Sequence, residues 1–144
     1  MQNFIEKMVL GTAQFGMDYG ISNLSGKPSK KEVFKILDLA WEKGVRIFDT
    51  APGYGSEALL GEFISTNVLS ENAKVLTKIP PLEGESDYEK AIMTTLESSL
   101  NNLGCPIDVL FFHNPADSRL LVKDPHFFEK LQRDNQVSNL GVSV

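Results

Sequence analysis

Four side chains in this sequence could together deliver a proton to a carbonyl oxygen while a hydride is added to the carbonyl carbon. Asp49 and Tyr54 stand five positions apart, directly after a short apolar run. Later apolar runs end at Lys78 and at His113. A phenol with its ordinary pKa of about 10 is a poor acid at neutral pH, and a nearby ammonium lowers that pKa by stabilising the phenolate. The set therefore predicts an acid, a charge that tunes it, and further groups that orient a substrate.

Each of the four residues has a chemical role under this hypothesis. Lys78 supplies the positive charge, and Asp49 holds Lys78 in place and keeps it charged. Tyr54 protonates the carbonyl oxygen, and neutral His113 donates a hydrogen bond to the same oxygen and orients the substrate. Taken singly, each residue is more often structural, in a loop, a turn or a strand end. Their joint position at successive strand ends is what favours a site.

Short apolar runs alternate with helical patterns along the chain. Nearly continuous apolar runs are typical of parallel strands that are covered on both faces. We predict strands at residues 8–10, 45–48, 73–78, 109–112 and 140–144. The two candidate residues Lys78 and His113 then close the third and fourth strands, and Asp49 closes the second.

The helices between these strands have explicit start and stop signals. Ser29–Glu32 and Ser86–Glu89 have the capping-box pattern, in which a hydroxyl and a carboxylate each satisfy an orphan backbone N–H. Ser56 is the expected cap of another helix, and Asp124 followed by proline begins the last one. Gly44 fits a left-handed stop for the first of these helices, and Gly104 ends the helix that begins near Ser86. Helices therefore separate all the predicted strands.

Strands that alternate with helices indicate βαβ units, right-handed crossovers and a parallel α/β sheet. Two architectures compete: an open doubly wound sheet and a (β/α)8 barrel. No Gly-x-Gly-x-x-Gly pattern follows the first strand, which weakens the dinucleotide-binding version of the open sheet. Both architectures place active sites at the carboxyl ends of the strands, where the four candidate residues stand.

Composition narrows the class of protein. The chain has 144 residues, which suits one domain, and its net charge of −5 is spread out, unlike the basic patch of a nucleic-acid-binding protein. Cys105 is the single cysteine, so no intrachain disulfide can form, which fits a cytoplasmic protein. No apolar stretch approaches the roughly 18 residues of a membrane span. His113 and His126 are the only histidines and neither has zinc-site spacing, so we predict no metal.

Several segments resemble the aldo-keto reductase family, and one of them resembles its bacterial branch. They run in family order and cover nearly the whole chain. The segments are Leu10–Gly16, Phe48–Glu57 with Leu60-Gly61, Leu76–Lys78, Ser99-Leu100 with Leu103-Gly104 and Asp108, Phe112–Asn114, and Leu140–Ser143. The Asp-x-x-x-x-Tyr-Gly motif followed by Thr-Lys and His is highly specific as a set.

The resemblance implies a (β/α)8 barrel that reduces an aldehyde or ketone with NADPH, or less often with NADH. Carried over to this sequence, it makes Tyr54 the general acid, tuned by Lys78 and Asp49, and it gives His113 the orienting role. Gly11, Thr12 and Asp49 match family positions near the nicotinamide ribose. The implied partner is a small carbonyl substrate, with no nucleic acid and no membrane.

Length limits this interpretation, because a barrel of this type takes about 250 residues. We expect residues 1–144 to form one truncated domain, the N-terminal half of the barrel, with about four βα units and the start of a fifth strand. Two further hypotheses remain. One is an inactive half-barrel that acts as a structural or oligomerising module and self-associates if the chain truly ends at Val144. The other is an open-sheet nucleotide-binding domain, which a reversal of strand order would indicate.

Overall fold

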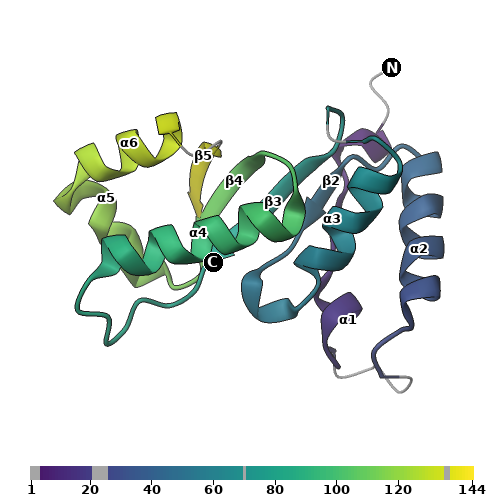
Figure 1. Ribbon diagram of the computed structural model, residues 1–144, viewed down its shortest axis with the longest axis horizontal. Coiled ribbons are helices and arrows are strands. Elements are labelled where there is room, and N and C mark those ends of the chain that lie inside the picture. Colours follow the sequence, from purple (N-terminus) through teal and green to yellow (C-terminus); the bar gives the residue numbers. More distant parts are fainter. Residues whose placement is uncertain (1–3, 21–25, 70, 135–136) are drawn as a thin grey trace.

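Five parallel strands, hydrogen-bonded in the order in which they occur in the sequence, form the centre of the molecule (Figure 1). The computed structural model describes residues 4–20, 26–69, 71–134 and 137–144. The strands are β1 (Val9–Gly11), β2 (Ile47–Asp49), β3 (Lys74–Ile79), β4 (Ile107–Phe112) and β5 (Val137–Val142). The order β1-β2-β3-β4-β5 never reverses. This order is that of a barrel and not that of a doubly wound open sheet, so the predicted class is confirmed.

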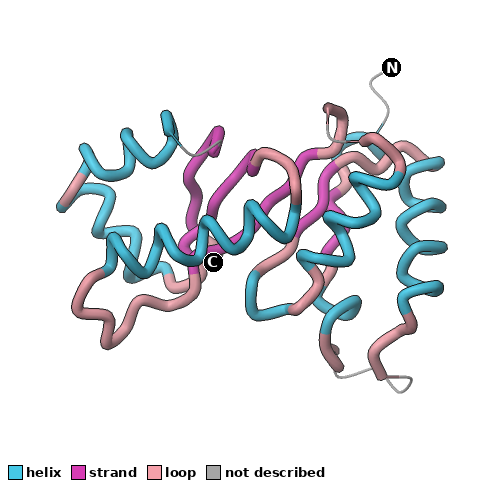
Figure 2. Tube along the Cα trace, in the orientation of Figure 1, coloured by secondary structure: helices cyan, strands magenta, loops and turns pink. Residues whose placement is uncertain are grey.

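Helices connect each strand to the next (Figure 2). The helices are α1 (Ala13–Gly16), α2 (Lys30–Glu42), α3 (Glu57–Thr66), α4 (Tyr88–Leu103), α5 (Leu120–Lys123) and α6 (Pro125–Asp134). Short 3-10 turns are η1 (Phe4–Lys7), η2 (Pro52–Tyr54) and η3 (Pro115–Arg119). Among the residues that the structure describes, no helix is long and apolar enough to cross a membrane.

Two of the predicted helix starts are confirmed in detail. Ser29 and Glu32 form the predicted capping box at the start of α2. Before α6, Asp124 Oδ1 accepts a hydrogen bond from the backbone N–H of Phe127 at 3.2 Å, and Pro125 is the first helical residue. The predicted left-handed stop at Gly44 is confirmed by its φ of 99°. Gly104 ends α4, as predicted, with a φ of 64°.

Two other predicted starts differ from the structure, one in its capping residue and the other in its capping bond. The cap of α4 is Asp87 and not Ser86, because the Asp87 carboxylate accepts a hydrogen bond from Lys90 N at 3.0 Å. A carboxylate at this position also interacts favourably with the helix dipole. Ser56 precedes α3, but its side chain makes no capping hydrogen bond. Its hydroxyl instead bonds to two other hydroxyls in the protein interior.

The predicted strands all occur, with shifted ends. The second strand begins at Ile47 and includes Asp49 as its last residue, and the fifth strand begins at Val137, three residues earlier than predicted. The early start of β5 follows from its pairing with β4, where Ile107 lies opposite Val137. Pairing with a neighbour, more than the polar local sequence, decides where this strand begins.

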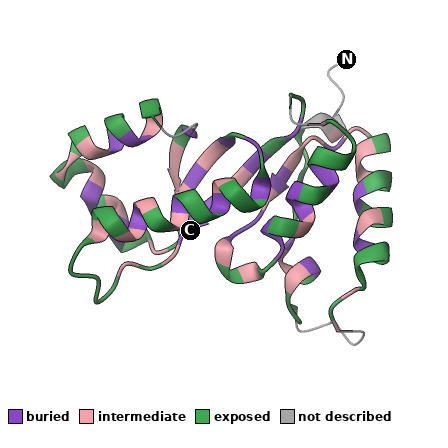
Figure 3. Ribbon diagram, viewed as in Figure 1, coloured by how far each residue is buried: buried purple, intermediate pink, exposed green. Residues whose placement is uncertain are grey.

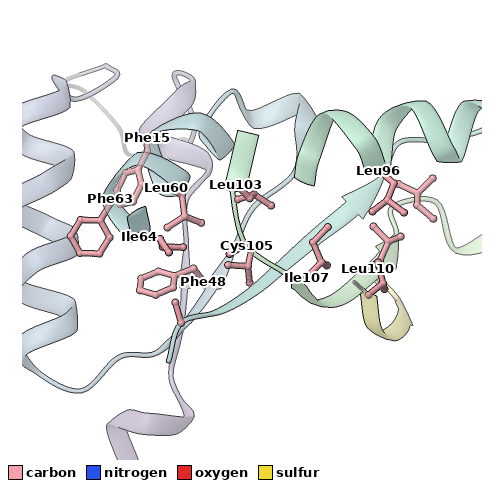
Figure 4. Close-up of a cluster of buried hydrophobic side chains, with 14 of the residues drawn as sticks. Phe15, Phe48, Leu60, Phe63, Ile64, Leu96, Leu103, Cys105, Ile107 and Leu110 are labelled. Carbon is pink, nitrogen blue, oxygen red and sulfur yellow. The ribbon is translucent and has the colours of Figure 1, made fainter. Parts of the chain in front are cut away.

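The hydrophobic core lies between the sheet and the helices that cover one of its faces. In Figure 4, Phe48 from β2 lies beside Phe63 and Ile64 of α3, and Leu96 of α4 lies beside Leu110 of β4. All five side chains are at most 1% exposed. Figure 3 shows the same distribution along the elements, with the buried residues of α3 and α4 facing the sheet and the outer surfaces of α2 and α4 exposed. This packing fixes the positions of the strand ends.

The opposite face of the sheet carries the polar candidates. Side chains alternate between the two faces along a strand, and parallel partners point to the same face. Gly11 pairs with Asp49, and Asp49 pairs with Leu76. Lys78 lies two residues beyond Leu76 in β3, hence on the same face, and pairs with Phe111. The register therefore brings Asp49 and Lys78 to the same face of adjacent strands.

Candidate active site

The loop between β2 and α3 positions Asp49 and Tyr54. Asp49 is the last residue of β2, and the backbone N–H of Thr50 donates to the carbonyl oxygen of Leu76 in β3 at 2.8 Å. The chain then folds into the turn η2, which ends at Tyr54. Gly55 follows with a φ of 69°, a conformation that glycine adopts without strain. The sharp turn leaves the Tyr54 side chain partly exposed close to the strand end.

The ammonium of Lys78 connects these residues. Its Nζ donates to Asp49 Oδ1 at 2.7 Å and to the backbone carbonyl oxygen of Thr50 at 2.9 Å. Lys78 is only 5% exposed, so this charge depends on its partners for the solvation that it has lost. The same Nζ lies 5.1 Å from the centre of the Tyr54 ring, within cation–π range. The structure thus brings the Asp49 carboxylate, the Lys78 ammonium and the Tyr54 phenol together.

His113 lies at the neighbouring strand end. It follows directly after β4, and its backbone N–H donates to the carbonyl oxygen of Ile79 at 3.1 Å, which joins the ends of β3 and β4. The side chain is exposed. Within the described part of the chain, its imidazole has no hydrogen bond or ion pair to the other candidates. The predicted set is therefore three residues in contact and one at the adjoining strand end.

The two predicted residues at the end of β1 have different environments. Gly11 is exposed, and a Cβ at this position would meet nothing within 4 Å, so there is open space beside its register partner Asp49. Thr12 is fully buried. Its hydroxyl and its backbone N–H both donate to the carbonyl oxygen of Asp49, at 3.0 and 2.9 Å. Thr12 therefore anchors Asp49 to the first strand.

Further residues of the site were not predicted from the sequence. Thr50 and Ser56 are fully buried and are linked through their hydroxyls, and Ser56 is also linked to Thr12. Gly16, at the end of α1, lies so close to the loop that a Cβ would come within 1.9 Å of the carbonyl oxygen of Tyr54. The only sequence signal for this contact is a glycine at the end of the Leu10–Gly16 segment, which does not reveal its partner.

A buried carboxylate supports the site from the helix-covered side of the sheet. Glu57, 3% exposed, is the first residue of α3. Its Oε1 accepts a hydrogen bond from the Thr77 hydroxyl at 2.8 Å, and its Oε2 accepts a longer one from Asn102 Nδ2 at 3.5 Å. Thr77 directly precedes Lys78, so Glu57 connects α3 and α4 to the segment of β3 that carries the lysine.

No metal site accompanies these residues in the described ranges, where no group of three His, Cys, Asp or Glu side chains is arranged to hold an ion. The arrangement instead has a buried ammonium beside a partly exposed phenol at the end of a parallel sheet. The sequence model of the Aldo/keto reductase family matches residues 7–144. The chain belongs to the aldo/keto reductase family.

Individual aldo/keto reductase relatives agree with this assignment. The chain is 31% identical over 136 residues to a D-threo-aldose 1-dehydrogenase from a Pseudomonas species, with 73% of this chain and 41% of that protein covered. It is 29% identical over 140 residues to aflatoxin B1 aldehyde reductase member 2 from Rattus norvegicus, with 94% and 36% covered. The chain therefore spans less than half the length of these two relatives.

The fold of the family is also found in solved structures. A crystal structure from Pseudomonas aeruginosa, which its own description places among the aldo-keto reductases, superposes with a TM-score of 0.74 at 27% identity. The superposition covers 94% of this chain and 54% of that chain. The five-stranded sheet thus corresponds to about half of an aldo/keto reductase barrel.

Proposed function

We propose that these residues belong to an oxidoreductase that reduces an aldehyde or a ketone with NADPH or, less often, NADH. They form the catalytic part of a single barrel domain in a cytoplasmic enzyme. Tyr54 is the general acid, Lys78 and Asp49 set its surroundings, and His113 orients the carbonyl group. The family membership and the clustering of these side chains at strand ends support this function.

One observation carries the proposal: a buried ammonium lies beside a phenol. Lys78 is held by two acceptors, Asp49 Oδ1 and the carbonyl oxygen of Thr50, which leaves its Nζ 5.1 Å from the Tyr54 ring. A charge in a site that is partly shielded from water acts more strongly on its neighbours than a charge in bulk solvent. Lys78 therefore places a fixed positive charge beside the phenol that the proposal makes the general acid.

In the proposed step, a hydride and a proton add to the carbon and the oxygen of one carbonyl group. The cofactor supplies a hydride to the carbonyl carbon when it is bound. The Tyr54 hydroxyl gives its proton to the carbonyl oxygen, so the product is an alcohol and the tyrosine becomes a phenolate beside Lys78. Because Tyr54 is partly exposed, solvent can return the proton. The exposed imidazole of His113 is free to donate a hydrogen bond to the same oxygen and to orient the carbonyl before transfer.

The described residues fit one portion of the cofactor. Open space adjoins Gly11, next to Asp49 at the strand ends, and glycine is favoured where a ligand approaches the backbone closely. We propose that the nicotinamide ribose lies along Gly11 and Asp49. The Thr12 hydroxyl is fully buried and bonds within the protein, so we propose that Thr12 acts on the cofactor through its hold on Asp49.

The substrate class follows from the proposed step and from the relatives. One relative is named as an aldose 1-dehydrogenase and another as an aldehyde reductase, and both names place the chemistry at a carbon of the aldehyde oxidation level. A small carbonyl compound is therefore the proposed substrate, with the reaction open to either direction.

The test measures NADPH oxidation by the product of the complete reading frame that contains these residues, with a panel of aldehydes and ketones. Replacement of Tyr54 by Phe removes one hydroxyl and should lower kcat by roughly 100- to 10,000-fold, the usual contribution of general acid catalysis. Lys78→Met should also abolish most of the activity.

The matched control is Tyr88→Phe, which removes the same atom from the tyrosine in α4. The Tyr88 hydroxyl donates to Asp124 Oδ2 at 2.9 Å and lies in a different part of the molecule, so kcat should stay near the wild-type value. A Tyr54→Phe enzyme that retains kcat within a few-fold, in folded protein, would refute the acid role. No activity with any carbonyl and either cofactor would refute the function as a whole.

A further inference from the structure

We propose that three buried hydroxyls, those of Thr50, Ser56 and Thr12, are positioning residues of this site. They form one hydrogen-bonded chain that fixes the loop carrying the acid against the lysine. The proposal rests on the proposed function for its kinetic readout, and it has a second readout that does not need turnover. None of the three is proposed to touch the reacting atoms.

The contacts are short and shielded from water. Thr50 Oγ1 lies 3.0 Å from Ser56 Oγ, and Ser56 Oγ lies 2.9 Å from Thr12 Oγ1. Thr12 Oγ1 then donates to the carbonyl oxygen of Asp49 at 3.0 Å. All three residues are 0% exposed, so water does not compete for these bonds. Buried hydrogen bonds of this kind are costly to break when one partner is lost.

The hydrogen bonds among the three hydroxyls all point in one direction. A carbonyl oxygen only accepts, so the single hydroxyl proton of Thr12 is used on Asp49. Ser56 must therefore donate to Thr12, and Thr50 must donate to Ser56. Because every proton is assigned, removal of one hydroxyl leaves its neighbour without a donor or an acceptor. Chains of hydrogen bonds that point the same way also strengthen one another.

Both ends of the hydroxyl chain are at the dipeptide that holds the lysine. The hydroxyl chain begins at Thr50, whose backbone carbonyl oxygen accepts a hydrogen bond from Lys78. It ends at the backbone of Asp49, whose carboxylate also accepts a hydrogen bond from Lys78. Ser56 lies two residues after Tyr54, so its bond to Thr50 closes the loop around the phenol. Without the bond between Ser56 and Thr50, the Tyr54 phenol and the two acceptors of Lys78 could move relative to the ammonium.

The Ser56 hydroxyl bonds within the loop instead of capping the helix that follows it. Ser56 stands at the N-terminus of α3, where a serine usually caps the helix, but its side chain makes no capping bond. The helix start is thus left without this cap, while the hydroxyl serves the loop. Thr12 comes from the end of β1 and is 44 positions from Ser56, so the hydroxyl chain also ties the first strand to the loop.

The test compares two substitutions at Thr50 in the product of the complete reading frame. Valine has the shape of threonine without the hydroxyl, and serine keeps the hydroxyl without the methyl group. We expect Thr50→Val to lower kcat by roughly 10- to 100-fold, the effect of misplacing reacting groups by up to about 1 Å, with KM little changed. Thr50→Ser should restore most of kcat, and Ser56→Ala should behave as Thr50→Val does. Equal losses in Thr50→Val and Thr50→Ser would overturn the proposal, as would wild-type kcat in folded Thr50→Val.

The second readout is hydrogen exchange of the Lys78 ammonium, followed by NMR of 15N-labelled lysine and assigned by its loss in Lys78→Met. A buried ammonium with two acceptors should exchange slowly, and Thr50→Val and Ser56→Ala should each accelerate its exchange while Thr50→Ser should not. Unchanged exchange in both hydroxyl-deficient variants would overturn the positioning role even if the enzyme were inactive with all carbonyls. Inactivity of the wild-type protein with slow exchange that responds to these variants would contradict the proposed function alone.

Discussion

The contact between Gly16 and the Tyr54 loop gives a quantitative prediction. A Cβ on Gly16 would lie 1.9 Å from the carbonyl oxygen of Tyr54, and the neighbouring backbone atoms of Gly55 and Ser56 are at 2.5 and 2.7 Å. Ordinary van der Waals contact begins at 3.4 Å, so Gly16→Ala must separate the two backbones by about 1.5 Å. The atoms in the way belong to the backbone and not to a flexible side chain, so the loop that carries Tyr54 has to move.

The expected cost in activity follows from this displacement. Misplacement of a reacting group by about 1 Å can cost roughly 100-fold in rate, which corresponds to about 2.7 kcal/mol. We therefore expect kcat of Gly16→Ala to fall by about 100-fold or more in the carbonyl reduction assay. The free energy of unfolding, measured with urea, should fall by about 1–3 kcal/mol, as is usual for overpacking.

Gly61→Ala is the matched control, because it creates a similar clash away from Tyr54. Its Cβ would lie 2.1 Å from the carbonyl oxygen of Asn102, where α3 packs against α4. This variant should lose comparable stability but much less kcat than Gly16→Ala, because the clash with Asn102 reaches the site only through Glu57. Wild-type kcat in folded Gly16→Ala would show that the position of the Tyr54 loop does not depend on this close contact. So would an equal loss of kcat in both variants, since general loosening would then explain the effect.

The remaining predictions concern a thiol, a strained residue and the sheet edges. Burial, with a smaller contribution from the charge of Asp108, raises the pKa of Cys105 to about 11, so iodoacetamide at pH 8 should modify the native thiol far more slowly than the unfolded one; equal rates would contradict this. Below about pH 9 the thiol is protonated in both the folded and the unfolded protein, so its contribution to the free energy of unfolding is complete there. This contribution should be lost as the pH rises from 9 through 11, and Cys105→Ala should not show that loss. Val68 is β-branched and has a φ of 54°, so Val68→Gly should raise the free energy of unfolding by about 0.5–1 kcal/mol in urea, and a decrease would show that this backbone is unstrained. The 144-residue polypeptide expressed alone should self-associate in light scattering, because β1 and β5 are sheet edges in the described residues and Met8 and Val9 at the β1 edge are each 49% exposed; a monodisperse monomer would contradict this expectation.

Local signals in the sequence were sufficient for much of the fold. The capping box at Ser29, the Asp124-Pro125 start and the stop at Gly104 depend only on residues within one turn of each helix, and all three are confirmed. The apolar runs likewise predicted five parallel strands, because a strand buried by helices has to be apolar over most of its length. The sequence placed Asp49 and Lys78 at neighbouring strand ends, and the observed register then brings them to one face of the sheet.

Long-range contacts account for what the sequence did not predict. Ser56 has the local pattern of a helix cap, but hydroxyls of Thr12 and Thr50 compete for it, and Thr12 is 44 positions away. The close approach of Gly16 to Tyr54 depends on where α1 lies, and a helix of four residues is too short to show periodicity in the sequence. These same contacts define the support of the candidate site.

Isotope transfer from the cofactor tests the proposed reduction, because it follows the hydride itself. The product of the complete reading frame is incubated with an aldehyde and with NADPH that carries deuterium at the transferable position of the nicotinamide, and the alcohol is analysed by mass spectrometry and NMR. We expect one deuterium on the carbinol carbon, with transfer almost abolished in Tyr54→Phe while NADPH still binds. Folded protein that binds NADPH and gives no deuterated alcohol, or Tyr54→Phe that transfers deuterium as fast as the wild type, would contradict the proposed reduction.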